Sequence, residues 1–119
     1  MITIWKYKVE PDFINQVYML PEGANILSFN VDPSGRLCFW AQVDTDAPLV
    51  ERIISCVGTG WPLDTVFNKT RYGIFIGTVA RDDYMWHLFD MGAAVASETF
   101  EVATESSIGE APAHETNNN

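Results

Sequence analysis

Alternating apolar and polar residues form the strongest pattern in the chain, between residues 25 and 44. Apolar side chains occupy every second position over 27–31, beginning with Leu27, and again over 37–43. A period of two is typical of strands that bury one face. The intervening Asp-Pro-Ser-Gly at 32–35 suits a tight turn, because proline fixes φ and glycine accepts a positive φ. The pattern predicts a β-hairpin that buries Leu27 and its alternate neighbours.

Five further segments carry strand patterns and are separated by turn residues: 2–9, 13–20, 52–57, 72–79 and 84–89. The segment 13–20 also fits a turn of helix, because periodicity over eight residues does not separate the two structures. The last two segments form a second predicted hairpin with its turn at 80–83, in which Phe75 and Val79 share a face. Seven short strands separated by turns favour an all-β fold, a small antiparallel β-sandwich or barrel.

The composition changes after Asp90. Residues 91–119 contain no lysine or arginine and supply five of the nine net negative charges through Glu98, Glu101, Glu105, Glu110 and Glu115. Apart from a short strand at 99–103, this stretch has too few apolar residues to offset the entropy of ordering. We therefore divide the chain into a compact β domain, 1–90, and an extended acidic C-terminal arm, 91–119. We expect the arm to lie on a neighbouring subunit.

The charge of the chain restricts its partners. Sixteen acidic residues against seven basic ones give a net charge of -9 and a pI near 4.4. Nucleic acids and anionic membranes repel such a chain, so we expect no direct nucleic-acid binding and no membrane association. The charge is compatible with an acidic decoy that occupies a basic groove on another protein.

Two short motifs resemble ligand sites without completing them. Gly58-Thr59-Gly60 lacks the Lys-Ser/Thr of a phosphate-binding loop and precedes Trp61, so it predicts a β-turn with a tryptophan lid. Asp82, Asp83 and His87 lie within six residues of one another, but one histidine beside two turn aspartates is not a zinc ligand set. We therefore expect no metal and no cofactor.

The residues suited to nucleophilic catalysis are poorly placed for it. Cys38 and Cys56 lie inside strand patterns, and no signal peptide precedes them, so we expect reduced, buried thiols. His114 belongs to the arm, where a general base would lack a fixed position. The sequence therefore predicts that the protein is not an enzyme.

Aromatic residues and arginines are the better candidates for a binding surface. Such residues are enriched at subunit interfaces, and they also suit a nucleotide-like ligand, whose base stacks on a ring while arginine pairs with phosphate. The interface or ligand candidates are Trp40, Trp61, Trp86, Tyr84, Arg52 and Arg71.

Several segments in order along residues 4–89 resemble a family of short, uncharacterised proteins of tailed bacteriophages and prophages, a domain of unknown function. The segments are Ile4-Trp5-Lys6-Tyr7, 20–28 (LPEGANILS), 38–44 (CFWAQVD), Gly58-Thr59-Gly60-Trp61-Pro62, Ile76-Gly77-Thr78 and Trp86-His87-Leu88-Phe89. The resemblance implies a phage origin and a compact β fold. It defines no catalytic residues.

These observations lead to a functional hypothesis. We expect a non-enzymatic structural or binding protein, a decoration or accessory protein of the phage virion that self-associates through its β domain and its C-terminal arm. Its partners would be further copies of itself and other phage or host proteins, in the host cytoplasm and in the virion. The alternative is an inhibitor of host defence, acting as an acidic decoy or as a sponge for a signalling nucleotide.

Overall fold

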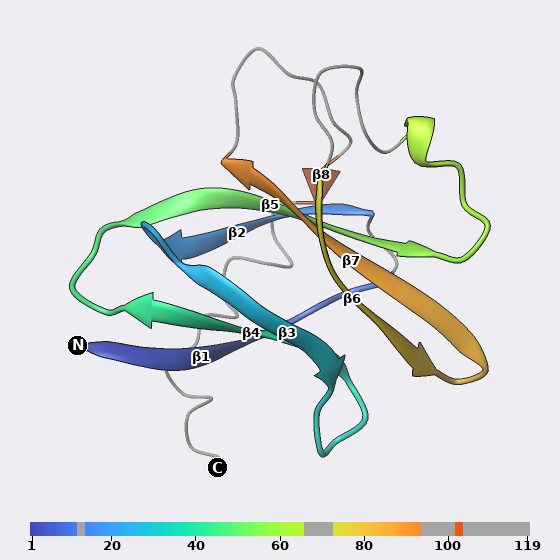
Figure 1. Ribbon diagram of the computed structural model, residues 1–119, viewed down its shortest axis with the longest axis horizontal. Helices are drawn as coiled ribbons and strands as arrows, with labels where there is room; N and C mark the ends of the chain where they lie inside the picture. The colour runs from blue at the N-terminus through green and yellow to red at the C-terminus, as the bar shows by residue number, and fades with distance from the viewer. Residues whose placement is uncertain (12–13, 66–72, 94–101, 104–119) are drawn as a thin grey trace.

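The computed structural model describes residues 1–11, 14–65, 73–93 and 102–103 (Figure 1). The fold is built from β-strands and one short 3-10 helix, η1. These elements are β1 (Ile2–Lys8), β2 (Asn15–Pro21), β3 (Asn25–Val31), β4 (Leu37–Asp44), β5 (Leu49–Gly58), η1 (Leu63–Thr65), β6 (Ile74–Arg81), β7 (Tyr84–Ala93) and β8 (Val102–Ala103). The described part of the chain contains no helix long and apolar enough to span a membrane.

Seven antiparallel strands pack as a sandwich of two sheets (Figure 1). The first sheet has the strand order β1-β4-β3, and the second has the order β6-β7-β5-β2. The two-residue strand β8 extends the second sheet by pairing parallel with β2 at Asn15 and Gln16. The predicted all-β fold is confirmed as a sandwich, and 13–20 contributes a strand rather than a helical turn.

Both predicted hairpins are present. In the β3–β4 turn, Gly35 has a φ of 88°, its N–H donates to the Asp32 carbonyl at 2.8 Å, and the Asp32 N–H donates to the Arg36 carbonyl at 2.8 Å. The β6–β7 turn is tighter than predicted and consists of Asp82 and Asp83, whose φ values are 55° and 65°. Aspartate tolerates this region, and a two-residue turn with both φ positive matches the strand twist.

Two β-bulges, one in β3 and one in β6, change which side chains face the core from those that the alternation predicts. In β3 the register shifts between Ile26 and Ser28, so Leu27 is the extra residue and is exposed, whereas Ile26 packs against the core. In β6 the register shifts between Phe75 and Gly77. Phe75 therefore opposes Phe89 on one face while Val79 is buried on the other. The predicted burial of Leu27 and the predicted shared face of Phe75 and Val79 were wrong. A bulge adds one residue to a strand and reverses the faces beyond it, and the apolar–polar pattern of the sequence does not reveal where this happens.

Two strands are longer than predicted. β5 begins at Leu49 rather than at residue 52, because Leu49 pairs with Pro21 at the end of β2. β7 continues past Phe89 to Ala93, three residues beyond the expected end of the β domain. The polar Asp90 interrupts the apolar pattern of β7 but is tolerated there because Arg52 pairs with it. Apart from 91–93 and 102–103, the predicted C-terminal arm lies outside the described residues.

An aromatic cluster joins the two sheets at the centre of the core. Tyr7 of β1 stacks on Phe39 of β4, with ring centroids 5.0 Å apart. Tyr18 of β2 meets Phe39 edge-on at 5.1 Å and Tyr7 edge-on at 6.1 Å. Its hydroxyl donates to the Lys8 carbonyl at 2.7 Å and lies 2.6 Å from Oε1 of Gln16. The two sheets are therefore connected by both ring packing and a hydrogen bond.

Asp32 holds the β3–β4 turn and also anchors β1. Its side chain accepts hydrogen bonds from the Ser34 N–H, the Ser34 hydroxyl and the Arg36 N–H, and it pairs with Lys6 at 3.0 Å. Burial disfavours the charged form, but the bonds from Ser34, Arg36 and Lys6 outweigh it and hold the pKa of Asp32 well below its usual range. A carboxylate in this state stabilises the fold while it is ionised.

We expect Asp32→Ala to lower the free energy of unfolding by about 1–3 kcal/mol near pH 7, because it leaves charged and backbone donors unpaired. Since the folded-state pKa is depressed, the Asp32 contribution is present above about pH 4 and is lost as the pH falls further. The difference between wild type and variant in urea denaturation should therefore shrink at acid pH. A difference that is independent of pH would contradict this role.

Candidate functional site

Three of the predicted site residues form one aromatic cluster, made of Trp61, Tyr84 and Trp86. Trp86 meets Trp61 edge-on at 5.6 Å and Tyr84 at 4.7 Å, and Nε1 of Trp61 donates to the Tyr84 hydroxyl at 3.1 Å. The predicted turn at 58–61 is present, because the Trp61 N–H donates to the Gly58 carbonyl at 3.2 Å. The turn brings the Trp61 ring back over the end of β5.

The aromatic cluster closes one end of the hydrophobic core. Trp86 packs against the buried core residues, and a Cβ atom on Gly58 would lie 2.9 Å from both the Trp61 and Tyr84 rings. Gly58 therefore gives these rings the room to lie against the β5 backbone. The rings contact one another rather than presenting parallel planes between which a flat ligand could insert.

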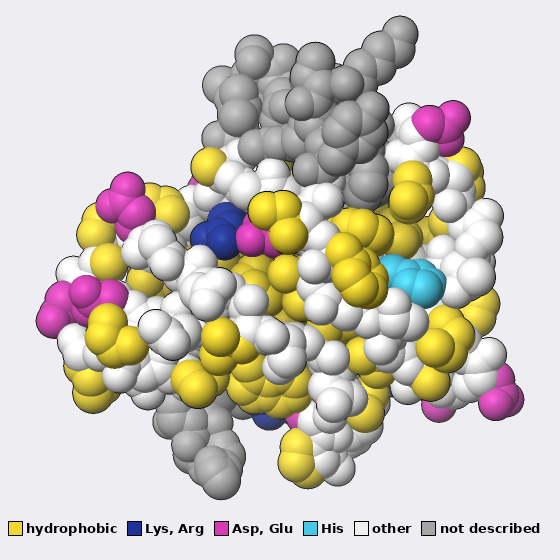
Figure 2. Space-filling view, viewed as in Figure 1, with side chains coloured by type: hydrophobic (Ala, Val, Ile, Leu, Met, Phe, Trp, Pro, Cys, Tyr) yellow, Lys and Arg dark blue, Asp and Glu magenta, His cyan; other side chains and the backbone are white. Residues whose placement is uncertain are grey.

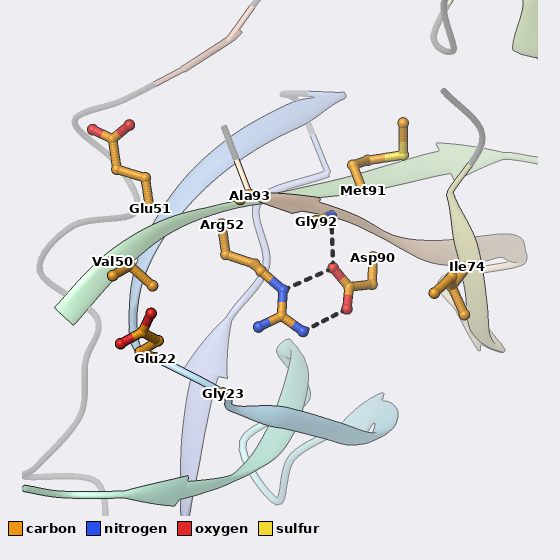
Figure 3. Close-up of a pocket in the computed structure, with 10 residues that line it drawn as sticks. All are labelled: Glu22, Gly23, Val50, Glu51, Arg52, Ile74, Asp90, Met91, Gly92 and Ala93. Atoms are coloured by element: carbon orange, nitrogen blue, oxygen red, sulfur yellow. Dashed lines mark hydrogen bonds and ion pairs between the residues drawn. The ribbon is translucent and has the colours of Figure 1, made fainter. Parts of the chain in front are cut away.

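Arg52 lies at the opposite end of β5 and is paired with Asp90 of β7 (Figure 3). Nε of Arg52 donates to one carboxylate oxygen at 3.0 Å, and Nη2 donates to the other at 2.7 Å. The Gly92 N–H also donates to Asp90, at 2.9 Å. The side chains of Arg52 and Asp90 are 18% and 11% exposed, so this bidentate pair is largely shielded from water.

The Arg52–Asp90 pair lies in an open pocket of about 630 Å³. Figure 3 shows Glu22 and Gly23 approaching the pair from the β2–β3 connection, with Ile74 of β6 on the far side of Asp90. Figure 2 shows a basic group in contact with an acidic one beside hydrophobic side chains on this face of the molecule. Asp90 takes up the Nε–Nη2 edge of the guanidinium and offsets its charge, which makes Arg52 a weaker partner for a phosphate.

The predicted candidates therefore occupy separate surfaces. Trp40 lies on β4 opposite Lys6 and Ser28, on the outer face of the first sheet, since its neighbours Phe39 and Ala41 are buried in the core. Arg52 and Gly58, where the aromatic cluster begins, are six residues apart on β5, or about 20 Å. Arg71 lies outside the described residues. No described surface combines Trp40, Arg52 and the aromatic cluster.

His87 lies at the surface, where Figure 2 shows its ring in cyan. Its Nε2 is 2.7 Å from the Thr59 hydroxyl, and its Nδ1 is 2.9 Å from the Thr78 hydroxyl. Each hydroxyl can donate or accept, so both ring nitrogens are satisfied in either tautomer. Within the described residues, no group of three or more histidine, cysteine or acidic side chains is arranged to hold a metal ion.

Both cysteines are buried and unpaired with each other. Burial, assisted by the neighbouring charge of Asp32, raises the pKa of the Cys38 thiol to about 12. Burial alone raises the pKa of Cys56 to about 12. Because the thiolate is the reactive form of cysteine, both thiols are poor nucleophiles at neutral pH.

Sequence reasoning missed the most exposed apolar residues of the sheets. Ile2 and Ile4 of β1 are 62% and 53% exposed, and Ile74 and Phe75 of β6 are 70% and 56% exposed. β1 and β6 are edge strands of the two sheets. Both strands carry apolar residues on both faces, so alternation does not reveal which face is buried. Strand order, which places these residues at edges, is the missing information.

The comparisons with known proteins identify a family. A family model described as a domain of unknown function, DUF7352, matches residues 1–98. The match covers all seven antiparallel strands of the sandwich. No curated protein and no solved structure matches the chain.

A double-mutant cycle tests the Arg52–Asp90 pair. We expect Arg52→Met and Asp90→Asn each to destabilise the fold, with a coupling free energy of about 1–3 kcal/mol, because each variant leaves a shielded charged partner unpaired. Urea denaturation of the wild type, the two single variants and the double variant measures this coupling. Strictly additive effects would show that the pair contributes nothing of its own.

Gly58→Ala tests the packing of the aromatic cluster. The added methyl group would displace the Trp61 and Tyr84 rings at a cost of about 1–3 kcal/mol, as in other overpacked sites. We expect Gly58→Ala to have a lower melting temperature and a tryptophan emission shifted to the red. In a background that carries Trp61→Phe, Gly58→Ala should cause little of this red shift. Unchanged emission and melting temperature in Gly58→Ala would contradict the observed packing.

Proposed function

This chain belongs to the DUF7352 family of domains of unknown function, and we propose that it is a non-enzymatic structural protein that associates with copies of itself. The observation that carries the proposal is the exposure of large apolar side chains on edge strands, above all Ile2, Ile4, Ile74 and Phe75. Exposed edges bearing such side chains favour pairing with another chain. Described polar groups suited to chemistry, such as His87 and Arg52, are instead bonded within the fold.

The distribution of charge supports association. The chain has a net charge of -9, yet β1, β2, β3 and β6 contain no carboxylate. Figure 2 shows a face in which hydrophobic and uncharged side chains dominate and acidic side chains lie mostly at the periphery. Two copies can therefore approach through surfaces on which their mutual repulsion is weakest.

The biological setting of the proposal comes from the resemblance to phage and prophage proteins. We propose that the protein is an accessory or decoration protein of a phage particle, in which the β domain and the acidic arm both contact neighbouring subunits. Mass spectrometry of gradient-purified particles tests this setting. Absence of the protein from the particles would contradict it.

Inhibition of a host protein is the second candidate. The net charge of -9 supports the acidic-decoy version, in which the chain occupies a basic groove. The nucleotide-sponge version has less support, because Trp61 and Trp86 pack edge-on against each other, Arg52 is paired with Asp90, and Trp40 lies on the other sheet.

Light scattering of the purified chain tests self-association. We expect a mass of at least twice the 13.3 kDa of one chain at concentrations of about 100 µM, because interfaces formed by sheet edges are small and bind in the micromolar range. A truncated chain that ends at Ala93 measures how much the C-terminal arm contributes to self-association. Association that remains after truncation is due to the β domain. A mass of 13.3 kDa at every concentration would contradict self-association.

A further inference from the structure

The edges of the two sheets differ in how well they are protected. The outer edge of β2 is paired with β8 at Asn15 and Gln16 and ends at Pro21, which lacks an N–H. β3 and β6 each contain a bulge and approach one another, since a Cβ atom on Gly77 would lie 3.6 Å from that of Phe29. No described strand pairs with the outer edge of β1.

β1 is also the most regular of these edges. All seven of its residues, from Ile2 to Lys8, pair with β4 without a register shift. Its inner face is fixed by Trp5, which packs against the core, and by Tyr7, which is 1% exposed. The Lys8 carbonyl accepts a hydrogen bond from the Tyr18 hydroxyl, and the regular backbone of the preceding residues is the template that an incoming strand requires.

The side chains of β1 suit a second copy of this acidic chain. β1 carries Lys6 and Lys8 and no carboxylate, so it is the most positive strand described. Both lysines are held in ion pairs within the chain, Lys6 with Asp32 at 3.0 Å and Lys8 with Glu10 at 3.3 Å. Ile2 and Ile4 are left as its exposed apolar side chains. Two copies would thus meet where each is least negative, with apolar groups in between.

We propose that β1 pairs antiparallel with β1 of a second copy, with Ile4 of each chain on the two-fold axis. The three-stranded sheets of the two copies then form one continuous sheet of six strands, in the order β3-β4-β1-β1-β4-β3. This inference rests on the proposed self-association and specifies the surface that performs it. An isologous pairing of this kind closes on itself and gives a dimer rather than a filament.

The side chains and the length of the pairing together select this register among the antiparallel alternatives. With Ile4 on the axis, residues 2–6 of the two strands pair, Ile4 opposes Ile4, and Ile2 lies beside the aliphatic stem of Lys6 of the other copy. With Thr3 on the axis, Ile2 would oppose Ile4, but only residues 2–4 of each β1 would pair. With Trp5 on the axis, both exposed isoleucines would oppose lysines. With Lys6 on the axis, two ammonium groups would face each other directly, which is destabilising.

Disulfide trapping tests the register. In an antiparallel pair the Cα atoms of opposed residues are about 4.5–5.5 Å apart, within the range that a disulfide spans. Ile4→Cys should therefore cross-link two copies on mild oxidation. Ile2→Cys is the matched control, because the Cα atoms of the two introduced cysteines would be about 13 Å apart along the strands. The native thiols do not compete, since Cys38 and Cys56 are buried.

We expect at least tenfold more disulfide-linked dimer from Ile4→Cys than from Ile2→Cys, measured by non-reducing electrophoresis on the full chain. Ile4→Lys, which places two charges at the axis, should weaken the dimer at least tenfold in light scattering, and circular dichroism checks that this exposed substitution leaves the fold intact. If the reduced chain is dimeric but the two cysteine variants cross-link equally or not at all, the β1 pairing is wrong while self-association stands. If the chain is monomeric throughout, both proposals fail.

Discussion

The position of β1 depends on the contact between Tyr18 and the end of that strand. Among the described strands, β1 pairs only with β4, so its attachment to the second sheet comes from the core. Tyr18 provides that attachment through its hydroxyl, which donates to the Lys8 carbonyl, and through its ring, which meets Tyr7 and Phe39 edge-on. Because these groups are buried, they hold β1 in a fixed orientation on the second sheet.

Two ion pairs connect strands of the sandwich outside the aromatic core. Asp32 ties the β3–β4 turn to Lys6 of β1, and Arg52 and Asp90 tie β5 to the last residues of β7. Trp61 and Tyr84 close the far end of the core over Gly58. Arg52, Trp61, Tyr84 and Trp86 therefore make structural contacts within the described fold. The self-association that we propose uses exposed sheet edges instead.

The sequence predicts the two hairpins well, because turn residues and alternation are local properties. It does not reveal the bulges at Leu27 and Ile76, which move side chains from one face to the other. Trp61, Tyr84 and Trp86 are correctly singled out, but their mutual packing depends on the pairing of β5 with β7. Ile2 and Ile4 are exposed because Trp5 and Tyr7 occupy the face of β1 that meets the core, and the apolar pattern of β1 does not show which face is buried.

Hydrogen exchange at the β1 backbone would test the proposed interface most directly. Alternate amides of β1 point away from β4, and in a monomer they should exchange rapidly with solvent. If β1 pairs with a second copy, these amides should become protected as the concentration rises from about 1 to 100 µM, while the core amides stay unchanged. Rapid exchange of the outward amides at every concentration, in a chain that scattering shows to be dimeric, would contradict β1 pairing.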